Sequence, residues 1–320
     1  MPDRNYGFAV GRIRVLETRL LDRGRLERMA DAADLHETLS QLGETEYAPL
    51  VASGLGPMEI AAAELARVRD LVVQLAPEAD DLAFLLWRWD LLNLKVLLRG
   101  EDGKADLNDL GRYRREEMAG WFRDGHPELP VFFAEARAAG ASAYAAEHDP
   151  QLLDAAVDRL YYHKGADRWR GRDTFLAGYW PARIDLLNLR TLVRAKHLDF
   201  DRRRLAALLL AGGTVPEERF AGALGQTWDE IAAWWAQGPY AGVLSACNSL
   251  ADLAALERAG ENLLLERAKP AKGIPLGLDP VLGYYLAKEH ETRLVNLVLT
   301  AKTAGVPGAR IKERLRGVYV

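Results

Sequence analysis

The chain alternates between stretches in which apolar residues recur every three or four positions and short polar stretches that contain glycine or proline. Leu91, Leu94 and Leu98, for example, follow the i, i+3, i+7 spacing that lines one face of a helix. No stretch alternates apolar and polar residues over the length of a strand between hairpin turns. These patterns predict an all-α fold.

Start and stop signals divide the pattern into separate helices. Pro77 suits a first helical position and Gly100 a position just past the end, so residues 77–99 are predicted as one long helix. A polar turn is expected at 164–172, and Pro181 is expected to kink the next helix or to mark its start. The other predicted helices span residues 6–21, 25–42, 58–75, 150–162, 201–210, 227–237 and 240–267, and a last one begins at 279.

One helical motif occurs three times, at residues 90–99, 185–196 and 291–302. The copies are 95 and 106 residues apart, whereas tetratricopeptide and HEAT-like arrays repeat every 34 to 47 residues or so. The longer period favours three small helical units over a solenoid. We expect their boundaries at 1–104, 105–199 and 200–320.

Each copy of the motif carries polar residues opposite its apolar stripe. An acid opens every copy, and an Asn follows three residues later in the first two. The candidate functional residues of the motif are Asp90, Asn93, Asp185, Asn188, Arg190 and Glu291. Aromatic residues precede each copy, among them Phe84, Trp180 and Tyr285. We expect these rings to be core anchors, because large rings dominate the burial between packed helices.

Composition narrows the possible functions. A net charge of −4 argues against a nucleic-acid binder, which needs a basic surface to contact phosphates. The one cysteine, Cys247, cannot form an internal disulfide and is expected to be a small buried thiol of a cytosolic protein. The first residues lack the apolar core of a signal peptide. No apolar run approaches the roughly 20 residues that cross a bilayer, so no membrane span is expected.

The sequence offers no recognisable catalytic constellation. Its six histidines are scattered, and neither His-x-x-x-His nor Cys-x-x-Cys occurs, so we expect no metal site. Gly212-Gly213-Thr214 is not followed by the Lys and Ser/Thr of a phosphate-binding loop, and no strand precedes it. We predict no catalytic residue, no cofactor and no enzymatic activity.

Several segments resemble one known family. The opening residues 6–21, the Asp-Leu-Leu-Asn-Leu-Arg run from Asp185, its twin from Asp90 and the last motif helix are similar to the C subunit of V/A-type rotary ATPases, the counterpart of the eukaryotic d subunit. The resemblance covers essentially the whole chain. The third copy departs from the pattern, because Leu294 and Asn296 stand where the first two copies have Asn and a basic residue.

The resemblance implies a funnel made of three helical units around a pseudo-threefold axis. It implies a central-stalk socket at the cytoplasmic face of the membrane, with the rotor shaft subunits of D and F type in its cavity and the membrane proteolipid ring on its opposite face. Such a protein transmits torque for proton or sodium transport coupled to ATP synthesis or hydrolysis, and binds no nucleotide itself. Neither the choice of ion nor the direction of the reaction follows from this chain.

Two questions stay open at this point. The motif residues either line the cavity and contact a partner, or they form bonds within each unit. The whole chain could also be an unrelated helical-repeat adaptor that holds soluble proteins together. Co-purification would separate the two functions, because a component of a rotary ATPase should bring down the shaft and the ring.

Overall fold

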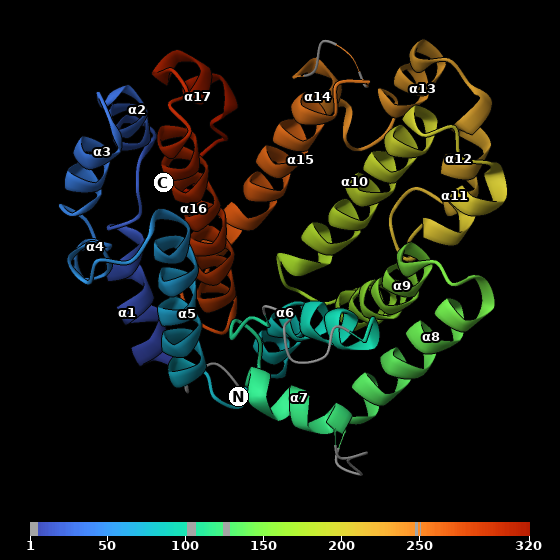
Figure 1. The fold of residues 1–320 in the computed structure, drawn as a ribbon, viewed down its shortest axis with the longest axis horizontal. Coiled ribbons are helices and arrows are strands. Elements are labelled where there is room, and N and C mark those ends of the chain that lie inside the picture. Colours follow the sequence, from blue (N-terminus) through green and yellow to red (C-terminus); the bar gives the residue numbers. More distant parts are fainter. Residues whose placement is uncertain (1–5, 101–106, 124–128, 247–248, 250) are drawn as a thin grey trace. The chain divides into compact units, whose positions relative to one another are not determined.

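The computed structural model describes residues 6–100, 107–123, 129–246, 249 and 251–320, and this part of the chain is helical without a strand, which confirms the all-α prediction (Figure 1). The helices are α1 (Gly7–Glu17), α2 (Arg23–Asp31), α3 (Leu35–Leu42), α4 (Ala48–Ala52), α5 (Pro57–Leu75), α6 (Asp80–Leu98), α7 (Arg115–Arg123), α8 (Val131–Glu147), α9 (Pro150–Trp169), α10 (Leu176–His197), α11 (Arg202–Leu208), α12 (Glu217–Gly222), η2 (Ala223–Gly225), α13 (Trp228–Trp235), α14 (Ala241–Ser245), α15 (Leu253–Ala268), η3 (Lys269–Gly273), α16 (Asp279–Thr303) and α17 (Gly308–Arg314). The η elements are 3₁₀ helices.

The helices form two compact units. Unit 1 combines both ends of the chain, Met1–Leu82 and Glu261–Val320, and unit 2 is the continuous segment Ala83–Gly260. In unit 1 the long helix α16 packs along α5 and also contacts α1, α2 and α3, so the first and last parts of the sequence share one core (Figure 1). Leu26, Ile60, Leu294 and Val298 belong to the apolar cluster of this core.

Unit 2 is organised around α9, which packs against α8, α10 and α11. Its core contains the aromatic residues that precede the first two motif copies. The ring of Phe84 in α6 stacks on Tyr161 of α9 at 4.9 Å and meets Trp169 and Trp180 edge-on at 5.3 and 5.8 Å. The prediction that these rings are core anchors is therefore confirmed for Phe84 and Trp180, which are both buried.

Two predicted long helices are interrupted in the structure. The predicted helix 25–42 is two helices, because Asp34 accepts a hydrogen bond from the backbone N–H of Glu37 and starts α3 anew. The predicted helix 240–267 is also divided, since Asp252 accepts from the backbone N–H groups of Ala254 and Ala255 at the start of α15. Cys247 lies outside the described residues.

The predicted turn at 164–172 was wrong over most of its length, because α9 continues to Trp169. Gly165 is inside this helix to admit the indole of Trp180, and a Cβ at that position would lie 2.3 Å from the ring. The chain turns later, at Gly171, whose φ of +69° favours glycine. Pro181 does not mark a helix start either, because α10 begins at Leu176.

Among the helices of the described residues, none is both long enough and apolar enough to cross a lipid bilayer.

Candidate functional site

The acids of the three motif copies are buried. Asp90 on α6 and Asp185 on α10 are 0 % exposed, and Glu291 on α16 is 5 % exposed. A buried carboxylate is costly unless it accepts hydrogen bonds or faces a cation. The partners of these three groups therefore indicate what the motif does.

In the second copy, Asp185 and Asn188 hold the segment that leads from α11 to α12. The carboxylate of Asp185 accepts the backbone N–H groups of Thr214 and Val215 at 2.8 and 3.1 Å. The amide of Asn188 donates to the carbonyl oxygen of Leu210 and accepts its N–H, both at 2.8 Å. One turn of α10 thus fixes a loop at two points, an arrangement we call a bracket.

The first copy forms the same bracket with a different loop. Asp90 accepts the backbone N–H groups of Arg112 and Tyr113 at 2.8 and 3.1 Å. Asn93 accepts the N–H of Asn108 at 2.9 Å and donates to its carbonyl oxygen at 2.8 Å. The acid and the Asn recur because each completes the backbone hydrogen bonding of a loop that has no helix or strand partner there.

A glycine precedes the bracketed N–H groups in both loops. A Cβ at Gly111 would lie 1.8 Å from the nearer carboxylate oxygen of Asp90, and one at Gly213 would lie 2.0 Å from that of Asp185. Both loops approach the helix so closely that no side chain fits. Neither glycine has a positive φ, so the backbone conformation does not require glycine at these positions. The close contact with the carboxylate does.

Burial raises the pKa of Asp185 above its ordinary value of 3.8, although Tyr240 and the N–H groups of Val215 and Thr214 partly oppose this shift. Because the folded state holds the proton more tightly, this group favours folding below its ordinary pKa. That contribution is lost as the pH rises through the raised value. The charged form is stabilised by backbone and hydroxyl donors.

The third copy holds a loop from the other end of the chain. Glu291 accepts the backbone N–H of Leu21 at 2.6 Å and the hydroxyl of Tyr47 at 3.0 Å. Lys288 donates to the same carboxylate at 2.7 Å and also lies 2.7 Å from Glu64 on α5. Arg67 completes the group by donating to Glu64 at 2.8 and 3.0 Å. We call Glu64, Lys288 and Glu291 the charged centre.

The charged centre is almost dry, since Lys288 is 2 % and Glu64 0 % exposed. Burial alone would lower the pKa of Lys288, but the facing Glu291 and Glu64 raise it above its ordinary value. Burial and Glu291 raise the pKa of Tyr47 well above its ordinary value. Lys288 is therefore a cation and Tyr47 a neutral donor at neutral pH.

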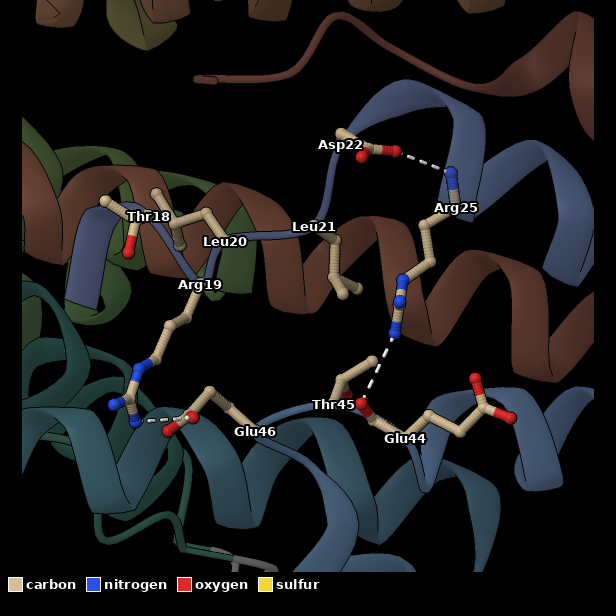
Figure 2. A pocket seen from close by; sticks show the side chains of 9 residues that line it. All are labelled: Thr18, Arg19, Leu20, Leu21, Asp22, Arg25, Glu44, Thr45 and Glu46. Carbon is tan, nitrogen blue, oxygen red and sulfur yellow. Dashed lines mark hydrogen bonds and ion pairs between the residues drawn. The ribbon is translucent and has the colours of Figure 1, made fainter. Parts of the chain in front are cut away.

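A pocket of about 430 Å³ opens beside the loop that Glu291 holds (Figure 2). Its lining residues are Thr18, Arg19, Leu20, Leu21, Asp22, Arg25, Glu44, Thr45 and Glu46. Arg19 donates to Glu46 at 2.9 Å across it, and the side chain of Asp22 accepts the N–H of Arg25 at 2.7 Å (Figure 2). Most of its polar groups thus already bond within the chain, which makes it a weak candidate for a ligand site.

The structure places five of the six predicted residues inside the units. Arg190 is the exception, because it is half-buried and lies 3.6 Å from Glu257. A partner could not touch the buried five directly in this conformation, so the geometry favours bonds within each unit. Partner binding by these residues stays a prediction. No trio of His, Cys, Asp and Glu in the described residues is arranged to hold a metal ion.

Sequence reasoning did not identify Lys288, Glu64, Gly111 or Gly213. Lys288 stands three residues before Glu291, where the other copies have Trp87 and Ala182. A lysine one helical turn before a motif acid was therefore visible in the sequence and indicated an ion pair at this copy. Glu64 had no such signal, since only the packing of α5 on α16 brings it to the centre.

Known proteins resemble this chain over most of its length. A family model described as the ATP synthase (C/AC39) subunit matches residues 9–314. The C subunit of the A-type ATP synthase of Thermococcus kodakarensis is 24% identical, and the match covers 96% of this chain and 89% of that protein. The C subunit of the V-type ATP synthase of Deinococcus radiodurans is 35% identical over 59% of each chain. The A-type protein of Methanosarcina acetivorans is 24% identical, with 97% of this chain and 92% of that protein covered. Because the family model spans nearly all of the described helices, this chain belongs to the ATP synthase (C/AC39) subunit family.

Proposed function

We propose that this chain is the non-catalytic socket of the central stalk in a V/A-type rotary ATPase. It couples the rotor shaft to the ion-carrying ring of the membrane and passes torque between them. The observation that carries the proposal is the family match over residues 9–314, together with relatives named as the C subunit of A-type or V-type ATP synthases. The shaft subunits of D and F type would occupy a cavity, and the proteolipid ring would meet the opposite face. The chain itself would lie at the cytoplasmic surface of the membrane.

The three-unit funnel belongs to the same proposal, with the boundaries 1–104, 105–199 and 200–320. One observation supports it. The first two motif helices hold loops through the same kind of bracket, and the third holds a loop through Glu291 at the equivalent position.

Stiffness is the property that a torque-transmitting protein needs. Close-packed interiors compress little and transmit strain. The brackets and the charged centre extend this rigidity to loops, because each connects a loop to the middle of a long helix. Loops that hold their shape under load would give a partner a fixed surface.

Reconstitution tests the function. The purified chain should bind a purified complex of the D-type and F-type shaft subunits, and separately a detergent-solubilised ring. A motor assembled without the chain should hydrolyse ATP without driving ion transport, and adding the chain should restore transport. A chain that binds neither assembly, or a motor that pumps equally well without it, would overturn the proposal. Stable association with unrelated soluble proteins alone would favour an adaptor.

The predicted partner-binding role of the motif residues has its own test. Asp185→Lys reverses the charge in one bracket, and shaft binding can be measured apart from thermal stability. Weaker binding per folded molecule would support the role. Lost stability with unchanged binding of the folded fraction would show that the motif has only a structural role. Arg203→Glu, on the exposed surface of α11, is the control charge reversal, because it breaks an exposed ion pair with Glu147 at 3.0 Å but no bracket.

A further inference from the structure

The segment 315–320, which follows α17, has no helix or strand of its own, yet it packs on the rest of unit 1. Leu315 and Tyr319 are buried, and both are only 4% exposed. Among the described residues, no backbone group of another segment bonds to residues 316–320. Side chains from several helices hold this segment instead, and we call it the strap.

The middle of the strap is bound through its backbone on three sides. Asn262 of α15 accepts the N–H of Gly317 at 2.7 Å. His290 of α16 donates from Nε2 to the carbonyl oxygen of Gly317 at 2.8 Å. Arg23 of α2 donates to the carbonyl oxygen of Arg316 at 3.1 Å. Three elements far apart in the sequence therefore converge on two neighbouring residues of the strap.

The far part of the strap is anchored by Tyr319. Lys272 of η3 donates to the carbonyl oxygen of this residue at 3.4 Å, and its ammonium lies 5.3 Å from the centre of the ring. The hydroxyl reaches α16 at Gly283, where an added Cβ would lie 3.1 Å from it. The strap thus connects α2, α15, η3 and α16, and its release would remove this connection from all four.

The strap can open while the core of unit 1 stays folded. Segments with few buried apolar contacts and no helix or strand bonds open at a lower free energy than core helices do. The strap adds Leu315 to the apolar cluster and packs Val318 against it, whereas α16 supplies Leu294, Val295 and Val298 to its centre. We therefore expect the strap to open more often than α16 unfolds.

His290 connects this opening to acid, because it is 5% exposed beneath the strap. The charged groups that face it are Glu261 on α15, Arg293 on α16 and Arg316 of the strap. Glu261 pairs with both arginines, at 3.6 and 2.8 Å, and Glu289 pairs with Arg293 at 3.1 Å. Neither acid is thus free to compensate a charged imidazole. Burial, with the arginines adding to it, lowers the pKa of His290 from 6.5 to about 4.

We propose that residues 315–320 are a releasable strap, which opens from unit 1 as one piece when His290 takes up a proton. The inference does not depend on the proposed function, because every contact that carries it lies within unit 1. An imidazole in water binds a proton below pH 6.5, whereas the covered one stays neutral until about pH 4, so acid favours the open state. This linkage predicts a rise in the opening equilibrium of about fourfold from pH 7.5 to 6, and of about 25-fold from pH 7.5 to 5.

Native-state hydrogen exchange of the full chain tests the proposal at the amide of Gly317, after correction for the intrinsic pH dependence of exchange. The wild type should show the two rises given above. His290→Gln keeps an N–H for the Gly317 carbonyl but cannot titrate, so its opening should not change with pH. Tyr319→Ala removes a buried ring but neither bond of Gly317, and should raise the opening about tenfold or more at every pH while keeping the pH dependence.

The amide of Val295, in the buried middle of α16, separates strap opening from the unfolding of unit 1. It should exchange far more slowly than the amide of Gly317. Equal opening free energies at the two amides would show that the strap does not move by itself, and would overturn the proposal. Opening at Gly317 that stays constant from pH 7.5 to 5, or that keeps the wild-type pH dependence in His290→Gln, would overturn it as well.

Discussion

Asp185 in unit 2 and Glu291 in unit 1 occupy the same place in two copies of one motif, yet they are stabilised differently. Asp185 accepts two backbone N–H groups, and within the described residues no lysine or arginine pairs with it. Glu291 accepts one backbone N–H, a tyrosine hydroxyl and the ammonium group of Lys288. The same motif therefore stabilises a buried carboxylate in two ways. We call the N–H donors at Asp185 the dipolar solution and the pairing of Lys288 with Glu291 the ionic solution.

The lengths of the two side chains account for part of this difference. Aspartate is one methylene shorter than glutamate, so the loop must come to the helix, and a glycine stands at the closest approach. Glu291 reaches further, and Leu20 precedes the bonded N–H of Leu21 where the other loops have Gly111 and Gly213. Leu294 replaces the motif Asn and joins the apolar cluster, so the third copy holds its loop through packing and charge.

The largest expected effect is at the ionic solution. Lys288→Met would leave two buried carboxylates, Glu64 and Glu291, without their shared cation. Arg67 still donates to Glu64, but no second lysine or arginine among the described residues pairs with Glu291. Removing one partner of a buried ion pair costs about 3 to 5 kcal/mol, because a charge is left uncompensated. Denaturant unfolding should therefore show unit 1 destabilised by an amount in this range.

A triple variant controls this experiment. Glu64→Gln and Glu291→Gln added to Lys288→Met remove all three charges at similar volume, and should recover most of the lost free energy of unfolding. If the unfolding free energy of Lys288→Met alone lies within about 1 kcal/mol of the wild-type value, the charged centre does not stabilise unit 1.

The two regions should also respond to pH with opposite sign. Beside the charged centre, burial lowers the pKa of His290 from 6.5 to about 4, with Arg293 and Arg316 adding to the effect and Glu261 and a bond to the Gly317 carbonyl opposing it. The unfolded chain binds this proton more readily, so stability is full above pH 6.5 and falls as the pH drops toward 4. The loss should reach about 3 kcal/mol. Asp185 has the reverse slope, because its pKa is raised.

Variants isolate the histidine. His290→Gln keeps a side-chain N–H for the Gly317 carbonyl but cannot titrate, so its unfolding free energy should lose this part of the decline between pH 6.5 and 4. His36→Gln, at an exposed position without an ion pair among the described residues, should keep the wild-type profile. A His290→Gln profile that runs parallel to the wild type would assign the acid sensitivity to other groups.

The smallest expected effect concerns the dipolar solution. Gly213→Ala would place a Cβ 2.0 Å from the carboxylate of Asp185, so the loop must move and its bonds to Asp185 must lengthen. Strain of this kind typically costs about 1 to 3 kcal/mol. Thermal unfolding should show the loss. Gly222→Ala, in α12 with no described residue within 4 Å, should be neutral or slightly stabilising. Equal melting temperatures for the two variants would show that the close approach of the Gly213 loop to Asp185 does not contribute to stability.

The sequence was most informative where structure depends on neighbours along the chain. Helix 58–75 was predicted within one residue of α5, because its apolar period is regular along the whole segment. The interruptions at Asp34 and Asp252 were missed, since an acid that caps a new helix reads like any other polar residue on a helix face. Gly165 was interpreted as a turn residue, but glycine is needed there because the indole of Trp180 packs directly against the helix.

The sequence by itself determined that the chain is helical, that one motif recurs in three helices, and that each copy opens with an acid. Only the tertiary structure decided what those acids do. Helical periodicity is a property of neighbouring residues, whereas the donor that meets Asn188 is 22 residues away and the one that meets Glu291 is 270 residues away. A buried carboxylate needs a partner, but which distant backbone or lysine supplies it depends on how the helices pack.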